Sequence, residues 1–155
     1  NYEARAEIMW CGSLSHNGLT GCGTCGGDWA THLMEHELGG MFDVAHGAGL
    51  AAVWGSWARY VMDEKPERFA QFAVDVMGVE ESDDVKSTAL KGIEAVEEFY
   101  RMTEMPTNMK ELGIDPTDEQ IKDMAMKATN HDTQQLGAFK KLSAKDLVEI
   151  YKTAK

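Results

Sequence analysis

The apolar residues of this chain recur at the spacing of helices rather than strands. Residues 48–54 are apolar around the whole circumference of a helix, which predicts a buried central helix. Residues 29–38 form an unbroken run of helix formers that Asp28 is expected to cap and that ends near the glycines at positions 39 and 40. The complete pattern predicts helices over residues 2–19, 29–38, 48–54, 66–77, 83–102, 117–128 and 143–154.

This pattern predicts an all-α fold of six or seven helices. The chain has 155 residues, which is enough to bury a core, so we expect one domain over residues 1–155. No segment alternates between apolar and polar residues, and no glycine-rich phosphate loop follows a strand pattern. An α/β nucleotide-binding domain is therefore expected to be absent from this chain.

The charge balance excludes some partners. The chain has 15 basic and 26 acidic residues, a net charge of −11, which argues against nucleic acid and anionic membrane surfaces. No apolar run approaches the roughly 20 residues that span a bilayer. Three cysteines are too few and odd in number for a disulfide framework. We therefore expect a cytoplasmic protein.

The histidines are the clearest chemical feature. Three of the five, His32, His36 and His46, fall within fifteen residues. His32 and His36 are four residues apart, so they share one face of a helix and can approach a common point. Neutral imidazole is a good ligand for Zn, Fe, Cu or Ni. The alternative is that one histidine is buried against a carbonyl group and the others face solvent.

Two other motifs suggest different chemistry. Residues 32–36 match the His-x-x-Glu-His pattern of inverted zinc proteases, in which Glu35 would be the general base and a carboxylate between Glu94 and Glu98 a further ligand. That hypothesis leaves His46 without a role. Cys22 and Cys25 have the spacing of a zinc or redox pair, but no second pair follows. A pair of loop thiols is the expected interpretation.

The histidine segment resembles a known family. Residues 27–38 and 43–51, with two helical histidines, a third histidine ten residues later and glycines beside it, resemble the iron-containing alcohol dehydrogenases. They are most similar to the butanol dehydrogenase and aldehyde reductase branch. The resemblance extends weakly as far as residues 130–132. It implies the helical C-terminal domain of that family, a multi-helix domain of the dehydroquinate-synthase-like type.

The resemblance also implies roles for individual residues. In this family an N-terminal α/β domain binds the nicotinamide cofactor, and the helical domain holds a divalent metal between the two. His32 and His46 match metal ligands, whereas the other two ligands precede this segment. His36 matches a histidine that lies near the nicotinamide and moves protons. Gly47 stands where a side chain would obstruct the cofactor, so His36 and Gly47 are the expected cofactor contacts.

The function implied is metal-assisted hydride transfer between a short-chain alcohol and its aldehyde, with NAD(P)H and Fe²⁺, or alternatively Zn²⁺. The expected partners are the small-molecule substrate and the protein's own N-terminal cofactor domain, in a homodimer as the complete enzyme. The 155-residue chain is expected to be inactive alone. The second hypothesis is a metal-binding or interaction module without catalysis, and the third is the zinc protease. Glu35 and Glu37 are expected at the surface or in support of the ligands.

Overall fold

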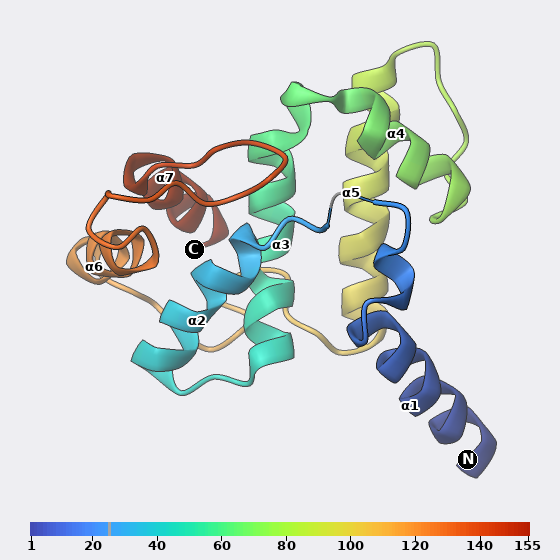
Figure 1. Cartoon of the computed structure of the whole chain (residues 1–155), viewed down its shortest axis with the longest axis horizontal. Helices are drawn as coiled ribbons and strands as arrows, with labels where there is room; N and C mark the ends of the chain where they lie inside the picture. The colour runs from blue at the N-terminus through green and yellow to red at the C-terminus, as the bar shows by residue number, and fades with distance from the viewer. Residues whose placement is uncertain (25) are drawn as a thin grey trace.

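The computed structural model describes residues 1–24 and 26–155, and this part of the chain is all-α, as predicted (Figure 1). The described residues form seven α-helices, two 3₁₀ turns and no strand. None of these helices combines the length and the apolar character needed to cross a membrane. The elements are α1 (Tyr2–His16), η1 (Leu19–Gly21), α2 (Ala30–Phe42), α3 (His46–Val61), η2 (Met62–Glu64), α4 (Pro66–Asp75), α5 (Val85–Met102), α6 (Asp118–Ala128) and α7 (Ala144–Ala154).

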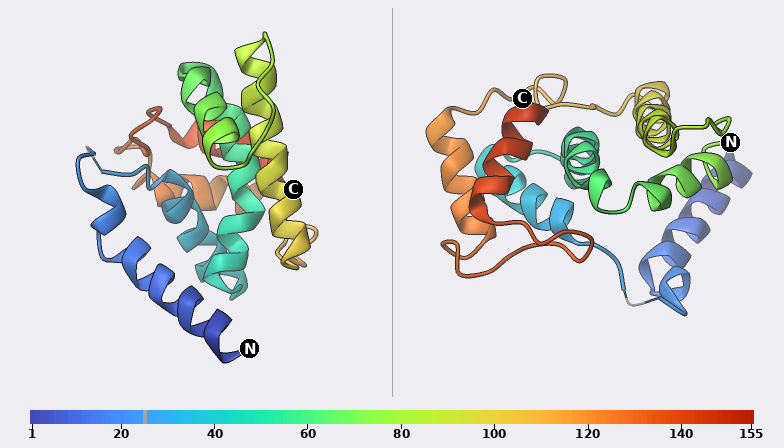
Figure 2. Two further views of the ribbon diagram at one scale, coloured as in Figure 1. Left: turned by 90° about the vertical axis from the view of Figure 1, so that its right-hand side faces the viewer. Right: turned by 90° about the horizontal axis from the view of Figure 1, so that it is seen from above.

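Helix α3 is the centre of the fold. It contacts α2 and α7 on one side and α5 on the other, while α4 packs against α5 and α6 packs against α2 and α7 (Figures 1 and 2). Nine of its residues are buried, among them Ala52, Val53 and Ala58. The apolar run of residues 48–54 therefore lies in a central helix, as its pattern predicted.

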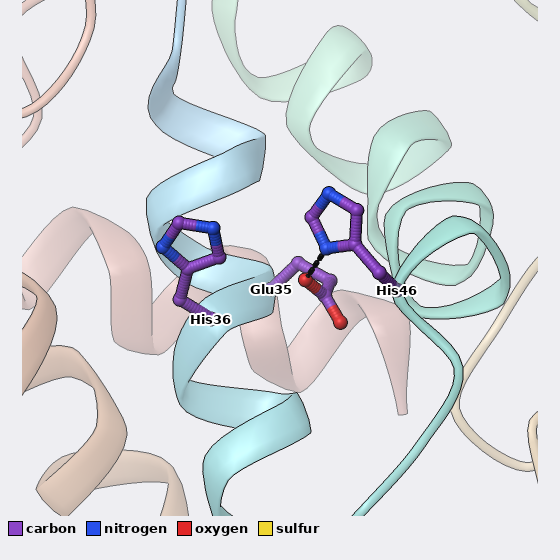
Figure 3. Close-up of side chains that lie close together, drawn as sticks. All are labelled: Glu35, His36 and His46. Carbon is purple, nitrogen blue, oxygen red and sulfur yellow. Dashed lines mark hydrogen bonds and ion pairs between the residues drawn. The ribbon is translucent and has the colours of Figure 1, made fainter.

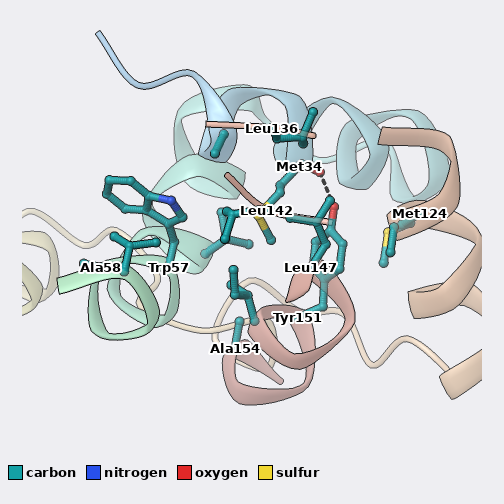
Figure 4. Packing of buried hydrophobic residues seen from close by; sticks show 14 of the residues in the cluster. Met34, Trp57, Ala58, Met124, Leu136, Leu142, Leu147, Tyr151 and Ala154 are labelled. Carbon is teal, nitrogen blue, oxygen red and sulfur yellow. Dashed lines mark hydrogen bonds between the residues drawn. The ribbon is translucent and has the colours of Figure 1, made fainter. Parts of the chain in front are cut away.

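Helices α2 and α7, which are far apart in the sequence, meet in the core. Met34 on α2 and Tyr151 on α7 are both fully buried, and the Tyr151 hydroxyl donates to the Met34 carbonyl oxygen at 2.7 Å (Figure 4). Burial raises the pKa of Tyr151. Full burial of a large apolar side chain contributes about 1.5–3 kcal/mol, and the hydrogen bond satisfies the one polar atom that Tyr151 brings into the core.

Asp28 fixes the beginning of α2 differently from the predicted cap. Helix α2 begins at Ala30 with Trp29 as its capping position, one residue later than expected. Asp28 still accepts from the Ala30 amide at 2.8 Å, and its second oxygen accepts from the Ala138 and Phe139 amides at 2.8 Å each. One carboxylate thus joins α2 to the loop that leads into α7.

The end of α2 also differs from the prediction. The helix continues through Gly39 and Gly40 to Phe42, four residues past the predicted end at Leu38. Asp43 then adopts a left-handed conformation with φ 53° and its amide donates to the Gly39 carbonyl. A left-handed residue just past the last helical turn is a common helix terminator. The glycine pair lies inside the helix, and Asp43 ends it.

Helix α1 stands apart from this core. None of its residues is buried, and its apolar side chains Ile8, Met9 and Trp10 are 72%, 72% and 62% exposed. It projects away from the other helices in Figure 1 and in the left view of Figure 2. The predicted helix is present, but the described residues bury no face of it.

Candidate metal centre

The candidate centre lies where α2 ends and α3 begins. Helix α2 carries His32, Glu35 and His36, and α3 has His46 as its first residue. The short link between the helices places Ala45 in an extended conformation, so the chain turns into α3 directly at His46. The beginning of α3 therefore faces the side of α2 that carries the histidines.

His46 is the centre of the imidazole cluster. Its ring centroid is 5.3 Å from that of His32 and 5.6 Å from that of His36. One ligand atom from each of Glu35, His36 and His46 lies within 4.8 Å of the other two (Figure 3). The structure thus brings together all three histidines that the sequence singled out, and it adds a carboxylate.

Glu35 is the buried member of this group. Its side chain is 2% exposed, whereas that of His46 is 50% exposed. Glu35 Oε2 contacts His46 Nδ1, and Figure 3 shows the carboxylate reaching from α2 to the beginning of α3. A histidine that donates one ring nitrogen to a carboxylate keeps the other nitrogen free to bind a metal.

The environment of His32 favours its neutral form. Partial burial lowers the pKa of His32, and the nearby positive charges of His46 and His36, when protonated, lower it further. Only the neutral imidazole has a lone pair for a metal. Crowding three histidines together therefore prepares at least this ring to act as a ligand.

Trp29 lies beside His32, at the edge of the histidine cluster. Its indole ring meets the His32 imidazole edge to face, with centroids 4.7 Å apart, and 56% of the residue remains exposed. The contact limits the rotation of His32. An exposed indole beside an imidazole cluster also offers an apolar wall to a small molecule that approaches the histidines.

The donor set suits a divalent transition metal. Imidazole nitrogen together with carboxylate oxygen is the ligand chemistry that Fe²⁺ and Zn²⁺ accept. The close approach of these donors from two helices, on an open side of the molecule, fits a metal that keeps coordination positions for other groups. The residues present therefore fit the metal that the sequence predicts.

The other residues that the sequence suggested for a site lie outside the histidine cluster or do not form the predicted contacts. Gly47 is exposed, and a Cβ built there would meet no atom within 4 Å. Cys22 is exposed, and Cys25 lies outside the described residues. Within the range proposed for a protease carboxylate, Glu97 instead binds Arg59 through two hydrogen bonds of 2.5 and 2.8 Å. The protease hypothesis also gives no role to His46, which lies at the centre of the cluster.

Trp29 had no predicted role at the site, and Glu35 was expected either at the surface or in support of the ligands, whereas it is buried. A signal for Glu35 was available, because the buried positions Thr31, Met34, Glu35 and Leu38 form a stripe at the spacing of one helix face. A carboxylate within such a stripe needs a partner. For Trp29 the signal was its position three residues before His32, which puts both on one face of the predicted helix.

The sequence model described as Fe-containing alcohol dehydrogenase family, C-terminal, matches residues 1–155. The chain is 36% identical over 155 residues to the probable NADH-dependent butanol dehydrogenase 1 of Bacillus subtilis, covering 99% of this chain and 39% of that protein. It is 32% identical over 156 residues to the NADPH-dependent aldehyde reductase YqhD of Escherichia coli, covering 100% and 39%.

Solved structures agree with these sequence matches. The crystal structure of NADH-dependent butanol dehydrogenase A from Thermotoga maritima matches with a TM-score of 0.87 and 34% identity, covering 99% of this chain and 39% of that one. The chain therefore spans about two fifths of the length of the proteins that it resembles.

Proposed function

Because this chain belongs to the Fe-containing alcohol dehydrogenase family, we propose that it is the metal-carrying helical part of an NAD(P)-dependent alcohol dehydrogenase or aldehyde reductase. The observation that carries the proposal is the approach of the His46 ring to both of the others, at 5.3 Å from His32 and 5.6 Å from His36 between ring centroids. The substrates proposed are short-chain alcohols and their aldehydes, because relatives are named as butanol dehydrogenases and an aldehyde reductase.

His32 and His46 are the proposed ligands. They come from two helices, and their rings meet at 5.3 Å. The metal is Fe²⁺ by family, with Zn²⁺ as the alternative, and the remaining two ligands are an aspartate and a histidine from the part of the enzyme that this chain does not span. Two imidazoles from one side leave room for those ligands and for a substrate oxygen.

The chemistry divides between the metal, the cofactor and this chain. When bound, the metal polarises a carbonyl group or acidifies an alcohol, while the nicotinamide gives or takes hydride. His36 is exposed and lies beside His46, so one of its ring nitrogens can exchange a proton with substrate or solvent. Trp29 shields one side of His32, and Gly47 leaves space for the cofactor.

The proposed partner is the cofactor-binding α/β domain of the same enzyme, in a cytoplasmic homodimer. The exposed apolar side chains of α1 support a further packing partner, because Ile8, Met9 and Trp10 form no core within the described residues. Exposed apolar surface of this kind marks an interface more often than a free face. We therefore place the rest of the enzyme over α1 and the open side of the cluster.

The test is metal binding by the 155-residue chain, measured by isothermal titration with Zn²⁺ and Ni²⁺. We expect weak binding that His32→Ala and His46→Ala each abolish, whereas His36→Ala retains most of it. His131→Asn is the control, because His131 is exposed and outside the cluster, and asparagine tolerates its φ of 57°. Equal losses in the His32 and His36 variants would contradict the ligand assignment.

A second measurement tests the catalytic part of the proposal. The 155-residue chain alone should not oxidise alcohol with NAD(P). Joined to its cofactor domain, it should oxidise a short primary alcohol, and His32→Ala in the longer protein should abolish that activity. Turnover by the short chain alone would contradict the proposal that catalysis needs both this helical part and a separate cofactor domain.

A further inference from the structure

Glu35 is a carboxylate in an apolar position. It belongs to the buried stripe of α2, and the residue is 1% exposed between Met34 and Leu38, which are both fully buried. Placing a carboxyl group there costs free energy unless partners compensate. A hydrophobic residue would suit the packing of the helix better, so the presence of a carboxylate requires another explanation.

Its partners account for only part of that cost. Oε2 contacts His46 Nδ1, but Oε1 is buried and has no hydrogen-bond partner among the described residues. The carboxylate therefore makes a single specific contact, and that contact is with the central histidine of the candidate site. A group selected for stability would be expected to satisfy both of its oxygens.

Two glycines make room for this carboxylate. A Cβ at Gly49 on α3 would lie 2.7 Å from both Cγ and Oε1 of Glu35, and a Cβ at Gly39 on α2 would lie 3.3 Å from Oε1. Contacts of 2.7 Å are too short for carbon, so a side chain at position 49 would displace the Glu35 carboxyl group. Both helices thus provide space for one carboxyl group and hold it against His46.

We propose that Glu35 is a positioning residue for His46. It accepts a hydrogen bond from Nδ1–H, fixes the orientation and the tautomer of the ring, and leaves the lone pair on Nε2 for a metal. This role rests on the proposed function, because it assumes that His46 binds metal through Nε2. The hydrogen bond also increases the donor strength of the imidazole, since the carboxylate balances the charge that the ring gives to a cation.

Three variants separate this role from a structural one. Glu35→Leu removes the acceptor but fills most of the volume, and Glu35→Gln retains the shape and an acceptor oxygen but removes the charge. Glu37→Gln is the matched control, because it makes the same chemical change two residues away on the same helix, where the side chain is half-buried and lies outside the cluster.

The first readout is the tautomer of His46 in the metal-free chain, from ¹H–¹⁵N spectra of the imidazole nitrogens. Wild type, Glu37→Gln and Glu35→Gln should hold the proton on Nδ1, whereas Glu35→Leu should shift it toward Nε2. The second readout is Zn²⁺ affinity, which should fall about 10–100-fold in Glu35→Leu and less in Glu35→Gln. The melting temperature should not fall in Glu35→Leu, because this change replaces a buried carboxylate that has an unpaired oxygen by an apolar side chain.

Several results would overturn the proposal. They are a wild-type His46 with its proton on Nε2, unchanged Zn²⁺ affinity in Glu35→Leu, and a loss of affinity that only follows a loss of thermal stability. Complete loss of Zn²⁺ binding in Glu35→Gln with the tautomer retained would make Glu35 a ligand itself. A wild-type chain that has the expected tautomer but binds no Zn²⁺ would overturn the metal-site assignment and still support the positioning of His46 by Glu35.

Discussion

At two of the helix crossings in the described part of the chain, a glycine makes room for opposite reasons. Where α2 meets α3, Gly49 leaves space for the Glu35 carboxylate. Where α4 meets α5, a Cβ on Gly92 would overlap the Cβ of Ala73 and lie 3.0 Å from its Cα. The first glycine accommodates a polar group that serves the site, and the second lets two backbones come close together.

The two crossings therefore have different roles: the α2–α3 crossing builds the candidate site, and the α4–α5 crossing stabilises the fold. The α4–α5 crossing is lined by buried apolar residues such as Phe69 and Ile93, and close packing there supports the fold. The α2–α3 crossing gives up part of that packing to a carboxylate with an unpaired oxygen. We therefore expect substitutions at the first crossing to change mainly stability, and substitutions at the second to change mainly metal binding.

The largest expected effect is at the apolar crossing. Gly92→Leu forces a side chain against the backbone of Ala73 and should cost about 3 kcal/mol, or a fall of roughly 10 °C in melting temperature. Zn²⁺ affinity of the folded chain should not change. Gly12→Leu on α1 is the control, because a Cβ there meets no atom within 4 Å. A loss of Zn²⁺ affinity without a loss of stability would break the comparison.

The matching substitution at the polar crossing is Gly49→Ala. The new methyl group displaces the Glu35 carboxylate, so Zn²⁺ affinity should fall about tenfold. Stability should change by less than about 1 kcal/mol, because alanine favours the helix over glycine by a similar amount and offsets the strain. Gly40→Ala, with no atom near the added Cβ, is the control. Thermal unfolding and titration calorimetry on the same samples measure both quantities.

A polar contact between α3 and α7, away from the candidate site, shows whether polar contacts in this fold can contribute to stability without affecting metal binding. The Tyr60 hydroxyl on α3 donates to Asp146 on α7 at 2.5 Å, which raises the pKa of Tyr60 to about 12. Burial acts to raise the pKa of Asp146, but hydrogen bonds from Ser143 and Tyr60 outweigh it and the pKa is lowered. We expect this contact to contribute to stability alone.

The sign of its pH dependence follows from the lowered pKa. Ionised Asp146 stabilises the fold above its unfolded pKa of about 3.8, and this contribution is lost as the pH falls below that value. Asp146→Asn should therefore cost about 1 kcal/mol at about pH 7 and little at about pH 2.5, as measured by thermal unfolding. Zn²⁺ affinity at about pH 7 should be unchanged. Glu7→Gln, on the exposed α1, should show no such pH-dependent difference.

The smallest expected effect comes from the substitution of isoleucine by valine, made once in the core and once on α1. Ile93→Val removes one methylene group from the core and should cost about 1 kcal/mol. Ile8→Val removes it from α1, where the side chain is 72% exposed, and should change stability by less than about 0.5 kcal/mol. Equal costs in thermal unfolding would mean that α1 packs against the core, contrary to the structure.

The sequence predicted the helices because their apolar spacing is local information. It placed the ends of α2 less well, since Gly39 remains helical beside Glu35 and the helix ends only at Asp43. For α1 the apolar positions predicted a helix correctly, but spacing alone does not tell whether a partner covers that face. Helix formation is local, whereas burial depends on the rest of the fold.

The candidate site shows the same difference between what local spacing predicts and what depends on tertiary packing. The spacing of His32, His36 and His46 predicted that they would lie together, and their rings are neighbours in the structure. Which of them bind a metal stays a prediction. The contact of Glu35 with His46 depends on the crossing of two helices, and that geometry is set by tertiary packing around Gly49.

The Asp28 carboxylate has a consequence for the order in which the protein is made. It joins the beginning of α2 to amides 110 and 111 residues further along, and Tyr151 reaches the Met34 carbonyl across 117 residues. Contacts of such long sequence separation form late in folding. While the chain emerges from the ribosome, the helix that carries His32 cannot reach its final position until Tyr151 has been added. We therefore expect a metal at the proposed site to be acquired only by a chain that already includes α7.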